Sequence, residues 1–302
     1  MRKMMLMLFL VICLIIPAAA TVETFDKKTA FSAANDFLIQ YENPNLAKIG
    51  ASAFDVVVMD YSSDGYTDGE YTRSQIEQLK NSPGGKKILI SYLCIGEAEN
   101  YRYYWKPEWK DNPPSWMGTT DPDWPDNCKV KFWDENWKKI IFGANSYLDK
   151  ILAAGFDGIY LDFIYAYEDW TSQFPDSDKR MITLVTEIAA YARSKSPDFL
   201  IITSNGLDLC SDKNYLQVLS GICVEDTWYD GDVSLSPKIT GEMLPSLDAI
   251  AKAGKKVFCV DFVTKKDLIK DFYTKARARG FVPYATSRDM KNLTINAGFE
   301  PD

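Results

Sequence analysis

The stretch GFDGIYLD, residues 155–162, contains the pattern that decides the fold of this chain. Gly155 precedes a short, mainly apolar run over residues 156–161, Gly158 lies within the run, and Asp162 follows it directly. A short run of β-branched, aromatic and aliphatic residues predicts a strand that is buried on both faces, as in parallel sheets. A carboxylate directly after such a strand is a candidate for chemistry, because ligands bind at the carboxyl ends of parallel strands.

Seven further runs of this kind occur along the chain. The full set comprises residues 37–39, 54–59, 87–95, 156–161, 199–203, 221–224, 256–260 and 280–284. Segments of helical periodicity lie between many of them, at residues 73–80, 135–154, 178–194, 245–253 and 266–279. This alternation predicts the α/β class, and eight repeats favour a single (β/α)8 barrel with a long aromatic-rich loop after the third strand. No glycine-rich phosphate loop follows the first run, which argues against a dinucleotide-binding sheet.

The first twenty residues have the pattern of a secretory signal peptide. Arg2 and Lys3 precede an apolar run over residues 4–16, and Pro17 leads into three alanines that end at Ala20. The run is shorter than the roughly 20 apolar residues of a membrane-spanning helix. We therefore expect cleavage near Ala20, a secreted protein that has no membrane association after processing, and one barrel domain over residues 21–302.

The composition limits the chemistry and the partners. Histidine is absent, which excludes a Ser-His-Asp triad and His-ligated zinc, so acid–base work would fall to carboxylates, tyrosine, lysine or cysteine. The net charge is −8, and removal of Arg2 and Lys3 makes it −10, which argues against nucleic acid as a partner. We expect a monomer that has no metal or other cofactor. Five cysteines remain in the processed chain: Cys94, Cys128, Cys210, Cys223 and Cys259. The sequence does not determine how they pair, and their odd number leaves at least one thiol unpaired within a monomer.

Carboxylates follow five of the eight predicted strands, and parallel strands of a barrel deliver them to one mouth. Hydrolysis of a glycosidic bond needs two such groups, one that protonates the leaving oxygen and one that attacks or activates water. Asp162 and Glu225 suit these roles because they end the fourth and sixth strands. Asp226 is the neighbouring alternative to Glu225, and only one of the two can face the centre. The expected substrate-binding residues are Asp60, Tyr61, Glu97, Tyr104, Trp105, Asn205, Asp226, Trp228 and Asp261.

Aromatic residues are concentrated after the third strand. Six of the eight tryptophans lie between residues 105 and 137, in a stretch with several prolines. Flat rings can stack on sugar rings, but we expect most of these tryptophans, Trp133 and Trp137 above all, to form a small core that holds the loop itself.

The strand-end motifs resemble those of glycoside hydrolase family 114. The matching stretches are VVVMDYS (56–62), SYLCIGEAE (91–99), YRYYW (101–105), GFDGIYLD (155–162), SNG (204–206), ED (225–226), PY (283–284) and RD (288–289). The resemblance implies an endo-α-1,4-polygalactosaminidase or related polysaccharide hydrolase, with Asp162 as the nucleophile and Glu225 as the acid/base of a retaining mechanism.

Two other functions fit the same fold. A non-catalytic carbohydrate-binding barrel would keep the aromatic loop, although the presence of both Asp162 and Glu225 argues against it. A Schiff-base lyase or aldolase needs a lysine at the barrel mouth, whereas Lys86, Lys87, Lys255 and Lys256 begin their strands and lie at the opposite end.

Overall fold

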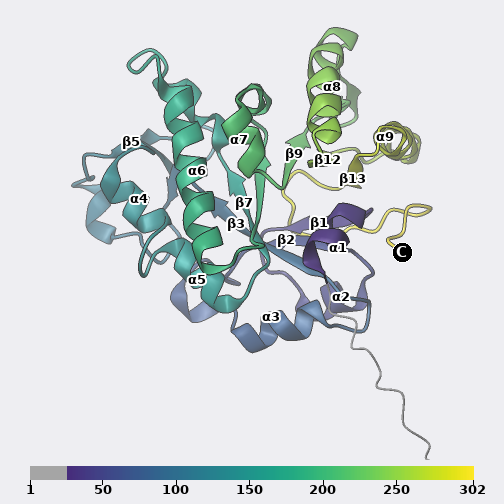
Figure 1. The fold of residues 1–302 in the computed structure, drawn as a ribbon, viewed down its shortest axis with the longest axis horizontal. Coiled ribbons are helices and arrows are strands. Elements are labelled where there is room, and N and C mark those ends of the chain that lie inside the picture. Colours follow the sequence, from purple (N-terminus) through teal and green to yellow (C-terminus); the bar gives the residue numbers. More distant parts are fainter. Residues whose placement is uncertain (1–25) are drawn as a thin grey trace, which may run out of the picture.

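The computed structural model describes residues 26–302, and its centre is a barrel of eight parallel strands (Figure 1). The predicted signal peptide lies outside the described residues. The order of the strands around the barrel follows the chain: β1 (Phe37–Gln40), β2 (Val56–Met59), β3 (Ile88–Cys94), β7 (Gly158–Asp162), β8 (Leu200–Ser204), β9 (Gly221–Glu225), β12 (Lys256–Asp261) and β13 (Val282–Ala285). All eight predicted strands are confirmed, as is the (β/α)8 fold.

The barrel is nearly closed, because the two strands that end this order lie side by side. The rings of Phe37 on β1 and Tyr284 on β13 lie 5.6 Å apart. Pro283 in β13 has no N–H to donate, and β13 forms a hydrogen-bonded ladder with β12 alone, so this strand tolerates the missing donor.

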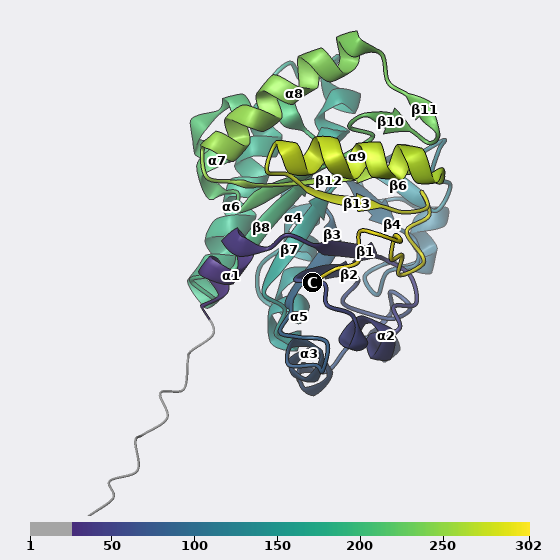
Figure 2. The same ribbon diagram turned by 90° about the vertical axis from the view of Figure 1, so that its right-hand side faces the viewer.

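Helices cover the outside of the barrel in both views (Figures 1 and 2). They are α1 (Lys27–Ala33), α2 (Leu46–Ala51), α3 (Arg73–Lys80), α4 (Glu135–Ile141), α5 (Tyr147–Ala154), α6 (Ser177–Lys195), α7 (Lys213–Val218), α8 (Pro237–Lys252) and α9 (Lys266–Ala278). Figure 2 shows α8 and α9 over β12 and β13. Within residues 26–302, no helix has the length and apolar character needed to cross a bilayer.

Two helices differ from their predicted extents. The predicted helix 135–154 is two helices, α4 and α5, because Gly143 (φ 120°) and Asn145 (φ 61°) turn the backbone and the Ser146 side chain caps α5. The predicted start of α8 at Pro245 is wrong. The helix begins at Pro237 after the Ser236 cap, and Pro245 lies in its interior, where it cannot donate a backbone hydrogen bond.

The segment after β3 is more ordered than the predicted loop. It contains β4 (Glu97–Glu99), β5 (Met117–Thr120) and β6 (Asn127–Val130), which form a separate antiparallel sheet, and the 3-10 helix η2 (Pro107–Lys110). Trp116 and Trp137 are buried, and Trp105, Trp109, Trp116 and Trp137 form a continuous row of ring contacts 5.0–5.5 Å apart. The expectation of a satellite core is confirmed for these residues and for Trp133, which packs against Trp170 and Phe174.

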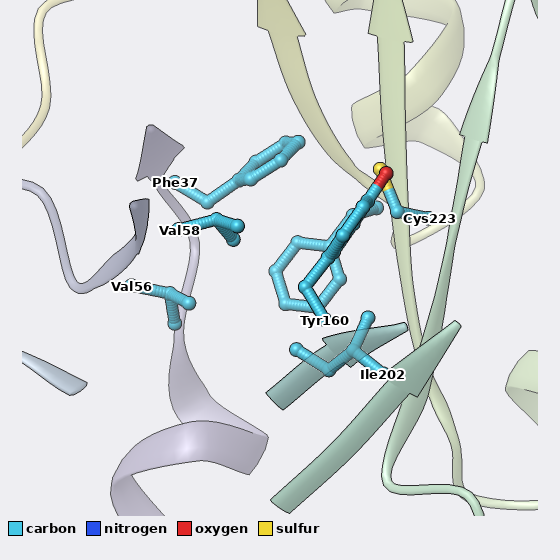
Figure 3. Close-up of a pocket in the computed structure, with 7 residues that line it drawn as sticks. Phe37, Val56, Val58, Tyr160, Ile202 and Cys223 are labelled. Carbon is cyan, nitrogen blue, oxygen red and sulfur yellow. The ribbon is translucent and has the colours of Figure 1, made fainter. Parts of the chain in front are cut away.

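The interior of the barrel is filled by side chains that alternate along each strand. Seven of them line one space, among them Val56 and Val58 of β2, Tyr160 of β7 and Cys223 of β9 (Figure 3). The gap that remains is too small for a water molecule. Because inward positions recur every second residue, the next inward positions on β7 and β9 are Asp162 and Glu225. The core of the barrel therefore aims both carboxylates into its mouth.

Candidate active site

Asp162 is held by hydrogen bonds to both of its carboxylate oxygens. The Phe163 N–H donates to Oδ1 at 2.8 Å, and the Tyr92 hydroxyl donates to Oδ2 at 3.0 Å. Burial raises the pKa of Asp162, whereas the Phe163 N–H, the Tyr92 hydroxyl and a hydrogen bond with Ser204 counteract that rise. These donors favour the ionised form, which a nucleophile requires.

Glu225 lies close enough to Asp162 for the two charges to interact. Burial raises the pKa of Glu225 to about 7, with further contributions from the negative charges of Asp162 and Asp226. Arg288 and a hydrogen bond with the Asn205 side chain lower it. The side-chain oxygen Oδ1 of Asn205 also accepts a hydrogen bond from the Glu225 N–H at 3.2 Å, so Asn205 ties the ends of β8 and β9 together.

Asp226 is committed to an ion pair and does not share the position of Glu225. Both of its oxygens accept hydrogen bonds from the Arg288 guanidinium at 3.0 Å, and Arg288 also bonds Asp230 at 2.6 Å. The Arg288 guanidinium lies over the ring of Phe262, 4.2 Å from its centroid. Alternation along β9 and this pairing leave Glu225 as the carboxylate that faces the centre of the mouth.

The backbone is strained where the site strands end. Phe163, Asn205 and Asp226 directly follow β7, β8 and β9 and have φ values of 56°, 56° and 50°. Residues other than glycine seldom adopt this left-handed backbone conformation, and those that do cluster at functional sites. Gly96 allows the close approach of the turn after β3, since a Cβ there would lie 2.3 Å from the carbonyl oxygen of Phe163.

Asp60 and Glu99 form a buried network with Arg102. Arg102 Nη1 lies 2.5 Å from Asp60 Oδ2, and its Nε lies 2.7 Å from Glu99 Oε2. The Tyr101 hydroxyl also donates to Glu99, at 2.6 Å. Burial raises the pKa of Asp60, although its contacts with Arg102 oppose that rise. Asp60 was expected to bind substrate, but its charge is neutralised from within the protein.

Glu97 and Asp261 are also buried, and both have structural partners. Glu97 accepts a hydrogen bond from the Asn127 amide at 3.0 Å, and burial raises its pKa to about 8. Asp261 is 0% exposed and accepts hydrogen bonds from the N–H groups of residues 227, 228 and 229 at 2.7–3.0 Å. On β12 the neighbouring Val260 aligns with Glu225 in the ladder, so Asp261 lies on the opposite face and supports the 226–230 segment.

Several predicted aromatic contacts lie beneath the surface. Tyr61, Tyr104 and Trp228 are buried, and Tyr104 accepts a hydrogen bond from the Glu99 N–H. Trp105 is half-buried against Trp109. Tyr61, Tyr104 and Trp228 therefore pack within the protein in this structure, and their contact with substrate stays a prediction.

Tyr165 and Tyr41 lie within range of the charges of both catalytic candidates, and neither was predicted from the sequence. Tyr165 is 40% exposed, in the 3-10 helix η3 (Ile164–Trp170), and its pKa is raised by burial and then by the charges of Asp162 and Glu225. Burial and the same two carboxylates raise the pKa of Tyr41, which follows β1. Each tyrosine lies shortly after a barrel strand, and this position in the sequence could have identified both as candidates for the site.

No disulfide forms among the cysteines of residues 26–302. The five that the structure describes are free thiols, and Cys94, Cys223 and Cys259 lie within strands as small buried side chains. Over residues 26–302, no group of three or more histidine, cysteine or acidic side chains has an arrangement that could hold a metal ion.

Comparison with known families identifies the chain. Residues 18–298 match the model of glycoside-hydrolase family GH114. The chain belongs to this family. It is 41% identical over 271 residues to an uncharacterised protein of Methanocaldococcus jannaschii, an alignment that covers 85% of this chain and 77% of the relative. An uncharacterised protein of Thermotoga maritima is 36% identical over 286 residues, which cover 90% and 87% of the two chains.

Solved structures support the fold of this GH114 member. The glycoside hydrolase domain of PelA from Pseudomonas aeruginosa superposes with a TM-score of 0.65 over 87% of this chain and 98% of that domain. An Anoxybacillus α-amylase superposes with a TM-score of 0.51 over 87% of this chain and 75% of the amylase. The identities are 14% and 10%, so these likenesses concern the barrel alone. Family and fold together show that this protein is a glycoside hydrolase.

Proposed function

We propose that this GH114 member is a secreted hydrolase of an α-linked, galactosamine-containing polysaccharide, which it cleaves with retention of anomeric configuration. The observation that carries the mechanism is the different environment of the two mouth carboxylates. Burial raises the pKa of both carboxyl groups, but Asp162 accepts three hydrogen bonds that oppose the rise and favour its charged form. For Glu225, burial and two neighbouring negative charges bring the pKa to about 7.

The proposed reaction has two steps. In the first, the Asp162 carboxylate attacks the anomeric carbon while the glycosidic C–O bond breaks and Glu225 gives its proton to the leaving oxygen. In the second, the Glu225 carboxylate takes a proton from water, the water oxygen bonds to the anomeric carbon, and the Asp162 ester bond breaks. The enzyme returns to its initial state, with one water consumed for each bond that is cut.

Substrate binding is assigned to the exposed face of Tyr165. Tyr165 is within range of the charges of both catalytic carboxylates and is 40% exposed, so the apolar face of a sugar could stack on its ring. The choice of galactosamine rests on the family resemblance of the strand-end motifs.

The decisive test compares four polymers: α-1,4-linked polygalactosamine, its N-acetylated form, an α-1,4-glucan and polygalacturonate. Reducing ends and mass spectra of the products should show cleavage of the amino-sugar polymers, and proton NMR should show that the α-anomer forms first. Asp162→Asn serves as the inactive control. Equal cleavage of polygalacturonate contradicts the substrate, an initial β-anomer contradicts retention, and binding without new reducing ends supports a non-catalytic barrel.

N-terminal sequencing of protein from its native host should begin near Thr21 if the chain is secreted.

A further inference from the structure

Tyr92 makes a direct contact with the carboxylate that the proposed function uses as its nucleophile. It lies on β3, next to the strand that carries Asp162, and its hydroxyl donates to Asp162 Oδ2 at 3.0 Å. The other oxygen of Asp162 is bound by the backbone of Phe163. The two donors come from different elements, so together they restrain rotation of the carboxylate.

The ring of Tyr92 is itself held in place. It packs against Tyr41, with ring centroids 4.6 Å apart, and the Arg102 guanidinium lies 5.5 Å from its centroid. Arg102 is 3% exposed and is bound by Asp60 and Glu99. Because Asp60 follows β2 and Glu99 belongs to β4, this network connects three segments of the mouth to the position of one hydroxyl.

We propose that Tyr92 is the positioning residue of the nucleophile, and that the Asp60–Arg102–Glu99 network holds Tyr92 in place. The inference rests on the proposed function, in which Asp162 attacks the anomeric carbon. Donation from Tyr92 stabilises the charged form of Asp162 before attack and again when the carboxylate leaves the glycosyl ester. Between these steps the ester carbonyl can accept the same hydrogen bond, so Tyr92 need not move during the cycle.

Other titratable or polar groups lie within electrostatic or hydrogen-bonding range of Asp162. They are Cys94 on β3, Glu99 on β4, Tyr41 after β1, Tyr160 on β7, Tyr165 in η3, Ser204 on β8, and Cys223 and Glu225 on β9. Each remains in place when the Tyr92 hydroxyl alone is removed, so a Tyr92→Phe variant isolates one donor.

The test compares Tyr92→Phe with Tyr147→Phe. Tyr147 is a buried tyrosine whose ring lies 5.6 Å from the Arg102 guanidinium, and among the described residues its hydroxyl has no hydrogen-bond partner. Loss of a hydrogen bond to a charged group should lower kcat of Tyr92→Phe by about 10- to 100-fold while KM changes little. The acid limb of its pH–activity profile should move to higher pH, because Asp162 loses a donor that favours its charged form. Tyr147→Phe should leave both unchanged.

A second measurement separates this inference from the proposed function. Carboxyl carbon NMR, assigned with Asp162→Asn, should show the Asp162 titration in Tyr92→Phe displaced upward by about one to two pH units. This readout does not require a substrate, so it decides the inference even if wild-type enzyme cuts none of the polymers. An unchanged Asp162 titration overturns the inference, and so do equal losses of kcat in Tyr92→Phe and Tyr147→Phe.

Discussion

At the scale of single residues, the chemistry depends on which of two adjacent carboxylates faces the mouth. Glu225 does so, and Asp226 is bound to Arg288. Glu225→Gln should lower kcat by about 10²- to 10⁴-fold on a polysaccharide, because the leaving oxygen loses its acid. Asp162→Asn should abolish turnover, and Asp226→Asn should have a much smaller effect. Steady-state kinetics check this, with circular dichroism as the control for folding. Near-normal turnover of Glu225→Gln on a polymer with a poor leaving group contradicts the assignment.

The pKa of Glu225 also sets the pH range of activity. The acid step needs protonated Glu225, so kcat/KM should fall as pH rises through about 7. In Asp226→Asn this basic limb should move to lower pH, because one negative neighbour is lost and Arg288 keeps its charge. A pH–rate profile of both proteins measures the limb. Movement to higher pH would show that Asp226 is not among the causes of the raised pKa.

Arg102 should matter for stability as much as for activity. It is buried between Asp60 and Glu99, and Arg102→Met would leave two buried carboxylates without their cation. Breaking a buried ion pair from one side costs about 3–5 kcal/mol. Urea denaturation at pH 7 should show this loss. Arg279→Met removes an exposed pair with Asp248 and should cost at most about 1 kcal/mol. Equal losses in the two variants contradict the argument.

At the scale of elements, the sheet β4–β6–β5 contributes to the free energy of unfolding by an amount that depends on pH. Glu97 of β4 bonds Asn127 of β6, and its pKa is raised to about 8 in the folded protein, mainly by burial. The folded state therefore holds a proton that the unfolded chain releases near the ordinary pKa of glutamate. Its contribution to stability is greatest at low pH and decreases as pH rises toward 8, by at most about 1.4 kcal/mol per pH unit.

Glu97→Gln should remove this dependence, since an amide can accept from Asn127 without becoming charged. The difference in Tm between variant and wild type should grow in favour of the variant from pH 5 to pH 8. Differential scanning calorimetry at several pH values measures it. Glu108→Gln changes an exposed glutamate in η2 and should track the wild type. A constant difference across this range for Glu97→Gln would mean that Glu97 is ionised throughout.

At the scale of the whole molecule, the charge distribution bears on the substrate. Three of the five strand-end carboxylates have internal functions, since Asp60 pairs with Arg102, Asp261 binds backbone N–H groups and Glu97 is buried with a raised pKa. Attraction of a cationic polymer therefore depends on the two remaining carboxylates at the mouth, Asp162 and Glu225, and on the net charge of −8 in the full sequence. KM for polygalactosamine should rise with ionic strength, whereas KM for its N-acetylated form should not. Assays from low to high salt measure this, and a KM for polygalactosamine that is independent of salt contradicts it.

Much of the architecture follows from local sequence. Eight apolar runs, helical periodicity between them and a carboxylate at the end of several runs are properties of neighbouring residues, and strands and helices form from such local patterns. The alternation of side chains on a strand then explains why Asp162 and Glu225 face inward and Asp261 does not. Local pattern did not reveal the break at residues 142–146, where positive φ angles at Gly143 and Asn145 end one helix before the next begins.

The contacts that complete the site were decided by tertiary structure. Tyr92 and Asp162 are 70 residues apart, Arg102 and Asp60 are 42 apart, and Arg288 and Asp226 are 62 apart. Tyr92 meets Asp162 because β3 and β7 are paired parallel strands, whereas Arg102 and Arg288 reach their partners from the segments after β4 and β13. Burial then sets which carboxylates keep their protons. The sequence determined the barrel and the residues at its mouth. The three-dimensional packing decided which of them are free to react, because neither register nor burial is a property of any one segment.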